Sequence, residues 1–212
     1  MTAAGGGAGL RARRVYLVRH GETELSTGGA YSGRQELPLT DDGREQARAV
    51  GERLRGAGID VVYSSPLSRA SDTARAIAEV TGAPLEIDDR LTEVDYGVLE
   101  NYDRDSAREE FGEPFERWRE DPFGSPFPGM EPLGEALARV RSAVSDALAA
   151  GECPAIVGHQ GVLRLVLIAL GQKRPEEYFD TRLKEAEPVE IESPSLVPGP
   201  GRGPPAGQPV KD

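Results

Sequence analysis

The sequence predicts an α/β fold: a three-layer α/β/α sandwich with a mostly parallel central sheet and an inserted lid segment. Short apolar runs alternate along the chain with longer stretches of helical periodicity, which is the order typical of parallel strands covered by helices. The length of 212 residues suits one such domain with a sizeable core. We therefore expect a single folded unit.

Strands are predicted where apolar residues run without a break, because both faces of a parallel sheet are buried. Residues 14–18 have this character, and four further short segments are predicted as strands: residues 59–63, 85–87, 155–158 and 189–191. The last of them fits the alternating order of strands and helices.

Helices are predicted where apolar residues recur every three or four positions. Thr40 is a suitable N-cap for the first helix, and Gly82 followed by Pro84 ends the second. The predicted helices cover residues 40–55, 67–80, 133–150 and 162–170.

One segment, residues 93–132, lacks clean periodicity and contains five prolines. We expect it to be an insertion or lid, partly helical over residues 104–119, that lies over the sheet edge rather than inside the core. The folded domain is expected to cover residues 14–192. A flexible N-terminal tail (residues 1–13) and a disordered tail rich in proline and glycine (residues 193–212) would flank it.

The composition excludes several classes of protein. A net charge of −11 argues against binding the nucleic-acid backbone. No apolar run approaches the ~18 residues of a membrane span, and the start lacks the order of a secretory signal, so we expect a cytoplasmic protein without a membrane partner. The single cysteine, Cys153, excludes an internal disulfide. The oligomeric state is left open, with a homodimer as one alternative.

Three short segments that carry polar chemistry each follow a predicted strand. They are RHGET at residues 19–23, SSPLSRA at residues 64–70 and GHQG at residues 158–161, and they contain both histidines of the protein. The carboxyl ends of parallel strands meet at one crevice of an open sheet. Two imidazoles and two guanidiniums would then form a pocket for phosphate.

The chemistry of these residues favours phosphoryl transfer. A neutral imidazole such as His20 is a competent nucleophile when its other nitrogen is held by a hydrogen bond, and the adjacent Arg19 can bind phosphoryl oxygens. His159 has the same relation to its own strand. The backbone amides of Gln160 and Gly161, at the start of the next helix, are expected to act as donors for an anion.

Five motifs in register resemble the histidine phosphatase superfamily, also called phosphoglycerate-mutase-like. They are LVRHGET at 17–23, LPLTDDGREQA at 37–47, SSPLSRA at 64–70 followed by Thr73 and Ala74, LTE at 91–93 leading to Tyr96 and Gly97, and VGHQGVLR at 157–164. The similarity extends from about residue 15 to residue 169 in the same order.

The resemblance implies a role for each core residue. His20 would attack the phosphoryl group and become a phosphohistidine, while Arg19, Arg69 and His159 would hold the equatorial oxygens. Glu93 would protonate the leaving oxygen and then activate water. No metal and no other cofactor would be required, because the guanidiniums and the second imidazole stabilise the charge.

Some positions depart from the pattern of the superfamily. Ser26 stands where many members have an asparagine that touches the phosphate. The loop that contains Ser32 and Gly33 resembles the loop at the same place in a branch of sugar-phosphate phosphatases. In that branch a serine is usual at the position of Ser26. By the same resemblance, Ser26, Ser32, Gly33 and Gln160 are candidate substrate-binding residues, together with Arg19, Arg69 and His159.

The function expected from these observations is metal-independent hydrolysis of a small phosphorylated metabolite, either a sugar phosphate or a nucleoside-type monophosphate. The enzyme would be a phosphomonoester hydrolase of the histidine acid phosphatase type. Two alternatives stay open: a phosphoglycerate-type mutase, and a catalytically silent phosphate-binding module of the same fold. A mutase needs extra cations for a second anionic group, whereas the predicted lid is acidic on balance. Within or near the lid, Arg34, Arg104 and Arg108 are the arginines that could touch a substrate tail.

Overall fold

The computed structural model describes residues 13–192, so the two predicted tails lie outside the described residues except for Arg13. The strands are β1 (Arg14–Arg19), β2 (Val61–Ser64), β3 (Leu85–Ile87), β4 (Pro154–Gly158) and β5 (Pro188–Glu192). The helices are α1 (Glu24–Thr27), α2 (Asp41–Arg53), α3 (Ser68–Thr81), α4 (Arg104–Phe111), α5 (Glu113–Glu120), α6 (Leu133–Ala150) and α7 (Gln160–Ala169), with short 3-10 turns η1 (Asp89–Leu91), η2 (Gly97–Leu99) and η3 (Pro175–Glu177).

The strands form one sheet in the order β3-β2-β4-β1-β5. Strands β1, β4, β2 and β3 are parallel, and β5 joins the edge antiparallel to β1. The central strands β1 and β4 are buried almost throughout, which explains their unbroken apolar sequences. The predicted α/β class with a mostly parallel sheet is confirmed.

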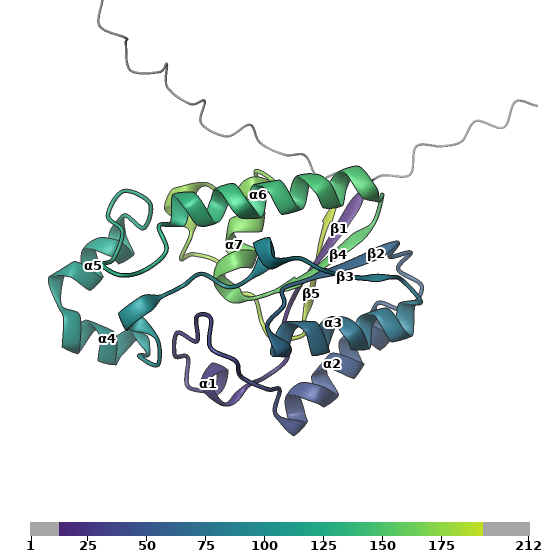
Figure 1. The fold of residues 1–212 in the computed structure, drawn as a ribbon, viewed down its shortest axis with the longest axis horizontal. Helices are drawn as coiled ribbons and strands as arrows, with labels where there is room; N and C mark the ends of the chain where they lie inside the picture. The colour runs from purple at the N-terminus through teal and green to yellow at the C-terminus, as the bar shows by residue number, and fades with distance from the viewer. Residues whose placement is uncertain (1–12, 193–212) are drawn as a thin grey trace, which may run out of the picture.

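Helices cover both faces of the sheet (Figure 1). Alternate residues of β1 point to opposite faces. Val15 and Leu17 belong to the larger hydrophobic cluster, which includes the buried faces of α6 and α7. Tyr16 and Val18 belong to a second cluster, with α2 and α3. The result is the predicted three-layer sandwich.

Local capping explains where two of the helices begin and end. The Thr40 side chain accepts a hydrogen bond from the Gly43 amide at 3.0 Å and caps α2. Gly82 has a φ of 74° and closes α3 in the left-handed conformation that glycine adopts without strain. The predicted boundaries of α6 agree with the structure, and those of the other main helices agree within a few residues.

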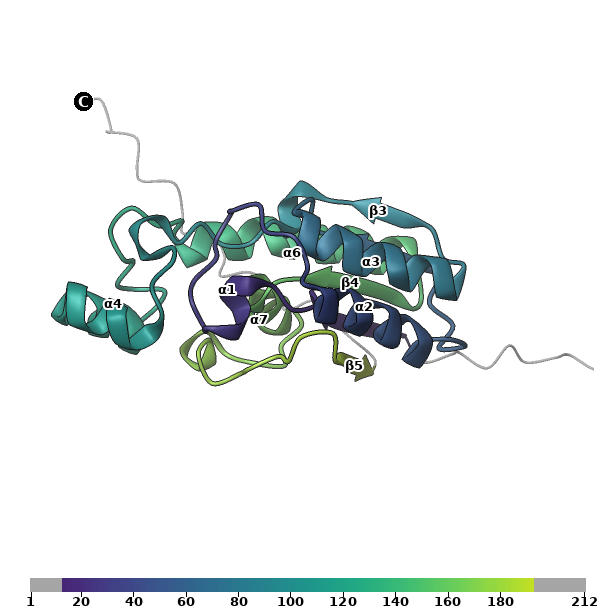
Figure 2. The ribbon, with the colours of Figure 1, turned by 90° about the horizontal axis from the view of Figure 1, so that it is seen from below.

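The inserted segment differs in part from the prediction. Its helical part is split at Gly112, which separates α4 from α5. Helix α4 lies beyond the end of the sheet (Figure 2), but the segment is not peripheral to the core. Phe115 and Trp118 are completely buried, and with Phe127 they join the larger hydrophobic cluster. The expectation that this segment lies outside the core is therefore wrong, because its aromatic residues supply part of that core.

No helix within residues 13–192 combines the length and apolar character that crossing a bilayer would require.

Candidate active site

The register of the sheet brings the predicted motifs to one edge. Arg19 of β1 pairs with Gly158 of β4, and the His20 amide donates a hydrogen bond to the Gly158 carbonyl at 2.9 Å. As a result, the residues that follow the two strands, His20 and His159, are neighbours. The centroids of their rings lie 5.2 Å apart.

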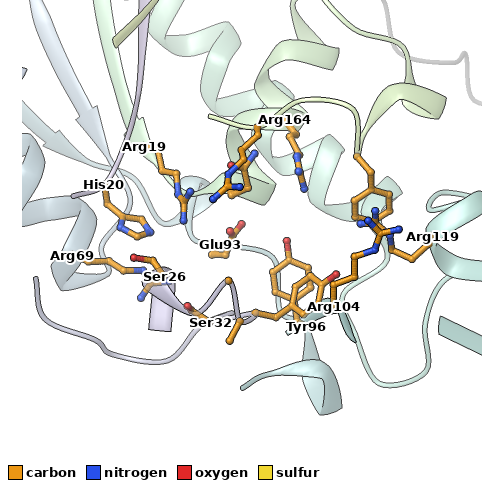
Figure 3. A pocket seen from close by; sticks show the side chains of 16 residues that line it. Arg19, His20, Ser26, Ser32, Arg69, Glu93, Tyr96, Arg104, Arg119 and Arg164 are labelled. Carbon is orange, nitrogen blue, oxygen red and sulfur yellow. The ribbon is translucent and has the colours of Figure 1, made fainter. Parts of the chain in front are cut away.

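A backbone contact fixes the tautomer of His20. Its Nδ1 lies 2.7 Å from the Gly21 carbonyl oxygen, which can only accept a hydrogen bond, so Nδ1 carries the proton. Burial lowers the pKa of His20 well below the ordinary value, and the charges of Arg19 and Arg69 lower it further. The neutral ring therefore keeps a lone pair on Nε2. Figure 3 shows the ring pointing into the pocket near Arg19 and Arg69.

A serine positions the ring of His159. The Nε2 of His159 lies 2.8 Å from the Ser65 hydroxyl, and Nδ1 has no hydrogen-bond partner among the described residues. Burial lowers the pKa of His159 well below its ordinary value, with further lowering by Arg69 and His20. This imidazole is also neutral near pH 7.

Arg69 and Arg19 are held in place through the terminal Nη atoms of their guanidinium groups. Arg69 donates to the carbonyls of Gln35 at 2.7 Å and Gly33 at 2.8 Å. Arg19 donates to the Leu183 carbonyl at 3.2 Å and forms a 2.9 Å ion pair with Glu185. The Nε atom of each arginine is buried and has no partner in the described part of the chain. Burial lowers the pKa of both guanidiniums, which stay charged near neutral pH.

The Glu93 carboxylate is bound at the start of α7. Its Oε2 accepts a hydrogen bond from the Gly161 amide at 3.0 Å, and its Oε1 accepts from the amides of Val162 at 2.9 Å and Val94 at 2.8 Å. The positive end of the helix dipole favours an anion at this position. From the sequence we expected the Gly161 amide to bind a ligand anion, and in the structure this amide binds Glu93 instead.

A cavity of about 380 Å³ opens in front of these groups (Figure 3). The predicted site residues that line it are Arg19, His20, Ser26, Ser32, Arg69, Glu93 and Gln160. His159 and Gly33 do not line it. The His159 ring lies beside that of His20, and Gly33 acts through its carbonyl on Arg69.

Two of the predicted substrate-binding side chains are already engaged. The Ser26 hydroxyl donates to the Thr23 carbonyl at 3.0 Å and accepts from the Thr23 amide at 2.9 Å, within the capping box of α1. The Gln160 side chain holds the segment after η3, because it donates to the Thr181 carbonyl at 3.1 Å and accepts from the Leu183 amide at 3.0 Å.

Several residues that line the cavity were not anticipated as site residues from the sequence. They are Tyr31, Tyr96, Arg119, Arg164, Phe179 and Arg182. Arg164 lies within the motif VGHQGVLR, five residues after His159. Its place on the first turns of α7 is a signal from which it could have been predicted as a site residue. Of the three arginines considered for a substrate tail, only Arg104 lines the cavity, since Arg34 pairs with Glu131 and Arg108 pairs with Glu116.

Within residues 13–192, no group of three or more histidine, cysteine, aspartate or glutamate side chains is arranged to hold a metal ion.

Comparison with known proteins assigns the family. The model of the histidine phosphatase superfamily (branch 1) matches residues 15–194, so the chain belongs to this superfamily. It is 40% identical over 152 residues to the probable phosphoglycerate mutase GpmB of Salmonella arizonae, a match that covers 69% of each chain.

Solved structures of related phosphatases have the same fold. A putative alpha-ribazole-5'-P phosphatase from Escherichia coli superposes with a TM-score of 0.74 at 28% identity, covering 88% of this chain and 95% of that one. A mycobacterial glucosyl-3-phosphoglycerate phosphatase superposes with a TM-score of 0.75 at 27% identity, covering 85% of this chain and 90% of the other. These relatives are described as phosphatases or mutases, which supports an enzyme of the phosphatase type.

Proposed function

We propose that this protein is a metal-independent phosphomonoesterase that hydrolyses a small phosphorylated metabolite through a phosphohistidine at His20. One observation carries the proposal: the His20 ring is neutral, is protonated on Nδ1 by its contact with the Gly21 carbonyl, and faces a cavity that Arg19 and Arg69 also line. A lone pair held between two guanidiniums suits attack on a phosphorus that carries negative charge.

In the first step, Nε2 of His20 attacks phosphorus in line with the ester oxygen. The N–P bond forms while the P–O bond to the substrate breaks. Arg19 and Arg69 bind the non-bridging oxygens, using the Nε atoms that lack partners in the described residues. His159 does not line the cavity, but its neutral ring lies beside that of His20, and its Nδ1 has no partner among the described residues. With a proton on Nδ1, the proposal assigns this atom as a donor to the phosphoryl oxygen nearest to it.

Glu93 is the one acidic side chain among the described residues that line the cavity, so the proposal assigns the proton transfers to it. Its protonated form donates a proton to the departing alcohol oxygen. Its carboxylate then accepts a proton from the water that attacks the phosphohistidine. Inorganic phosphate leaves, and His20 returns to its neutral state.

The size and charge of the site support a small-molecule phosphomonoester as the substrate. A cavity of about 380 Å³ is at the lower end of the range for small-ligand sites. The net charge of −11 opposes binding to a nucleic-acid backbone.

Mutase activity is the second candidate, because the Salmonella relative is described as a probable phosphoglycerate mutase. A mutase returns the phosphoryl group to a second hydroxyl of the same substrate, whereas a phosphatase gives it to water. Incubation with 3-phosphoglycerate separates the two activities: a mutase forms 2-phosphoglycerate without release of phosphate, and a phosphatase releases phosphate.

The proposal is tested by phosphate release from p-nitrophenyl phosphate and from a panel of phosphorylated metabolites. We expect turnover by the natural chain and a loss of about 10³-fold or more in His20→Ala, with circular dichroism spectra that match. Equal rates for the two proteins, or no turnover of any compound by the natural chain, would contradict the proposal. The latter result would favour the silent phosphate-binding module.

A further inference from the structure

One motif of the sequence has no role in the reaction described so far. Residues 37–47, with the sequence LPLTDDGREQA, contain the cap and the first turns of α2, and none of them lines the cavity in front of His20. Helix α2 packs beside α3, which carries Arg69, on one face of the sheet (Figures 1 and 2). Any effect of this motif on the reaction must therefore pass through the residues that it contacts.

The motif contacts the residues that directly follow His20. The Thr40 amide donates to the Glu22 carbonyl at 3.0 Å, and the Thr40 hydroxyl donates to the Glu22 carboxylate at 2.9 Å. The two segments approach so closely that glycines are required on both sides. A Cβ atom on Gly21 would lie 2.4 Å from the Gly43 carbonyl oxygen, and one on Gly43 would lie 2.2 Å from the Glu22 carbonyl oxygen. The start of α2 therefore fixes the loop after His20.

Gln46 holds the peptide plane that contains the Gly21 carbonyl. The side-chain Oε1 of Gln46 accepts a hydrogen bond from the Glu22 amide at 2.9 Å. The Glu22 N–H and the Gly21 C=O belong to one planar peptide unit, in which the two groups point in opposite directions. This unit therefore donates to Gln46 on one side, and on the other side it accepts from Nδ1 of His20 at 2.7 Å.

Thr73 holds the peptide plane on the other side of Gly21. Its hydroxyl accepts a hydrogen bond from the Gly21 amide at 3.0 Å and donates to the Arg69 carbonyl, one helical turn earlier, at 2.8 Å. The Thr73 side chain is completely buried, so both hydrogen bonds are shielded from water. Because both of its flanking peptide planes are held, Gly21 keeps its carbonyl directed at the His20 ring.

The position of this carbonyl decides which nitrogen of His20 is able to attack. A neutral imidazole has a proton on one nitrogen and a lone pair on the other, and the hydrogen bond made by the first nitrogen selects the tautomer. Without the Gly21 carbonyl in place, the proton is free to move to Nε2, and that tautomer has no lone pair toward the cavity. The hydrogen bond to Gln46 also polarises the peptide unit, which strengthens its carbonyl as an acceptor.

We propose that Gln46 and Thr73 are positioning residues for His20: they hold Gly21 so that its carbonyl keeps the proton on Nδ1 and the lone pair on Nε2. The inference rests on the proposed function for its effect on the rate, and it gives the motif at residues 37–47 a role in the reaction. Neither side chain lines the cavity, so neither contacts a phosphate bound there. The two residues therefore act on the reactivity of His20 rather than on the binding of phosphate.

The first test replaces Gln46 with residues of similar size. Gln46→Met removes the acceptor oxygen, and Gln46→Glu keeps one. We expect Gln46→Met to lower kcat/KM for p-nitrophenyl phosphate by about 5-fold, the effect of one neutral hydrogen bond, and Gln46→Glu to restore most of this loss. The inhibition constant of inorganic phosphate should stay within about twofold of the natural value in both variants. Gln172→Met is the control, at an exposed glutamine beyond the far end of α7, and should change neither quantity.

The second test removes the hydroxyl of Thr73. Thr73→Val should lower kcat/KM by about 10-fold, because the buried amide of Gly21 loses its acceptor, whereas Thr73→Ser keeps the hydroxyl and should stay within about twofold of the natural chain. Thr81→Val is the matched control on the same helix. The Thr81 hydroxyl likewise donates to the carbonyl one turn earlier, that of Ile77 at 2.8 Å, but it accepts from the Ala83 amide rather than from Gly21.

Nitrogen-15 NMR of the histidine rings gives a readout that a loss of stability alone would not move. In the natural chain near pH 7, His20 should have a protonated Nδ1 and an unprotonated Nε2, with its signals assigned by their absence from His20→Gln. Gln46→Met and Thr73→Val should change both ring shifts, and Gln46→Glu and Thr73→Ser should keep them. Gln46 is only half-buried, so its variants decide the question if Thr73→Val does not fold.

Three results would overturn the inference. The first is a natural set of His20 ring shifts in Gln46→Met. The second is a loss of kcat/KM in Thr81→Val as large as that in Thr73→Val. The third is a rise in the phosphate inhibition constant of Gln46→Met that equals its loss of kcat/KM.

The two proposals can fail separately. If the natural chain hydrolyses p-nitrophenyl phosphate but the His20 ring shifts do not respond to Gln46→Met, the proposed function stands and the positioning role does not. If no compound is hydrolysed but the ring shifts respond to Gln46→Met and not to Gln172→Met, the positioning role stands and the proposed hydrolysis does not.

Discussion

The carboxylate of Glu93 accepts a hydrogen bond from the backbone amide of Gly161 at 3.0 Å, so the first turn of α7 fixes the position of the proposed proton donor. The close approach is possible because residue 161 lacks a side chain. A Cβ atom there would lie 2.5 Å from the Tyr96 hydroxyl and 2.7 Å from Oε1 of Glu93.

Gly161→Ala is therefore expected to displace Glu93 and to lower kcat by about 10²-fold, the effect of a misplacement near 1 Å. The change in kcat is measured by steady-state kinetics with p-nitrophenyl phosphate. Gly134→Ala is the matched control, because a Cβ at that position in α6 would meet no atom within 4 Å. Equal kcat values for the two variants would contradict the role given to Gly161.

Ser65 is expected to act through His159. Ser65→Ala removes the hydroxyl that lies 2.8 Å from Nε2 of His159. Loss of this one neutral hydrogen bond should lower kcat/KM by about 5-fold. The ¹⁵N shifts of the His159 ring should change as well. The control is Ser64→Ala, whose hydroxyl donates to the Ser65 carbonyl at 2.9 Å and is likewise buried. Unchanged ring shifts in Ser65→Ala would exclude the positioning role.

The inserted segment should be required for the stability of the whole domain. Trp118 is completely buried against other aromatic rings, including Phe179 at 5.0 Å between centroids. Trp118→Ala should lower the free energy of unfolding by about 3 to 5 kcal/mol, measured by urea denaturation. Val98→Ala, at a side chain that is 54% exposed, should change it by no more than about 0.5 kcal/mol. A loss below about 1 kcal/mol in Trp118→Ala would mean that the segment folds independently of the core.

The two buried histidines should make the protein sensitive to mild acid. An unfolded chain protonates its histidines near the ordinary pKa of 6.5, whereas the lowered pKa values keep both rings neutral in the folded state. Below about pH 6.5 the unfolded state thus binds more protons, and stability falls as pH falls, by up to about 1.4 kcal/mol per pH unit for each histidine. The loss continues until the pH reaches the folded-state pKa values.

Urea denaturation between about pH 5.3 and pH 7 tests this dependence of stability on pH. This range lies above the ordinary pKa values of carboxyl groups, so their titration contributes little. The double variant His20→Gln/His159→Gln, which lacks both histidines of the protein, should have a shallower dependence on pH than the natural chain. Identical slopes would show that other groups control the sensitivity to acid.

Much of the fold could be predicted from the sequence because the signals are local. The continuous apolar residues of β1 and the periodicity of α6 identify those elements without knowledge of their neighbours. The convergence of His20 and His159 could also be predicted, since it follows from the general rule that parallel strands end at one edge.

The remaining features depend on contacts between distant segments. The approach of Glu93 to the amide of Gly161, and the stacking of Arg119 on Phe179, join residues about 60 or more positions apart and leave no periodic pattern in the sequence. The sequence indicated an insertion that is partly helical over residues 104–119 and lies over the sheet edge. In the structure its helical turns bury Trp118 in the core, because the aromatic contacts that place it there join segments that no local pattern relates.

The identity of the phosphorylated residue tests the central claim most directly. The natural chain is mixed with ³²P-labelled substrate, quenched in alkali within milliseconds and mapped by mass spectrometry after proteolysis. The account predicts an acid-labile phosphoryl group on His20 that is absent from His20→Ala. Label on a serine or carboxylate side chain, or turnover in His20→Ala at the rate of the natural chain, would contradict it.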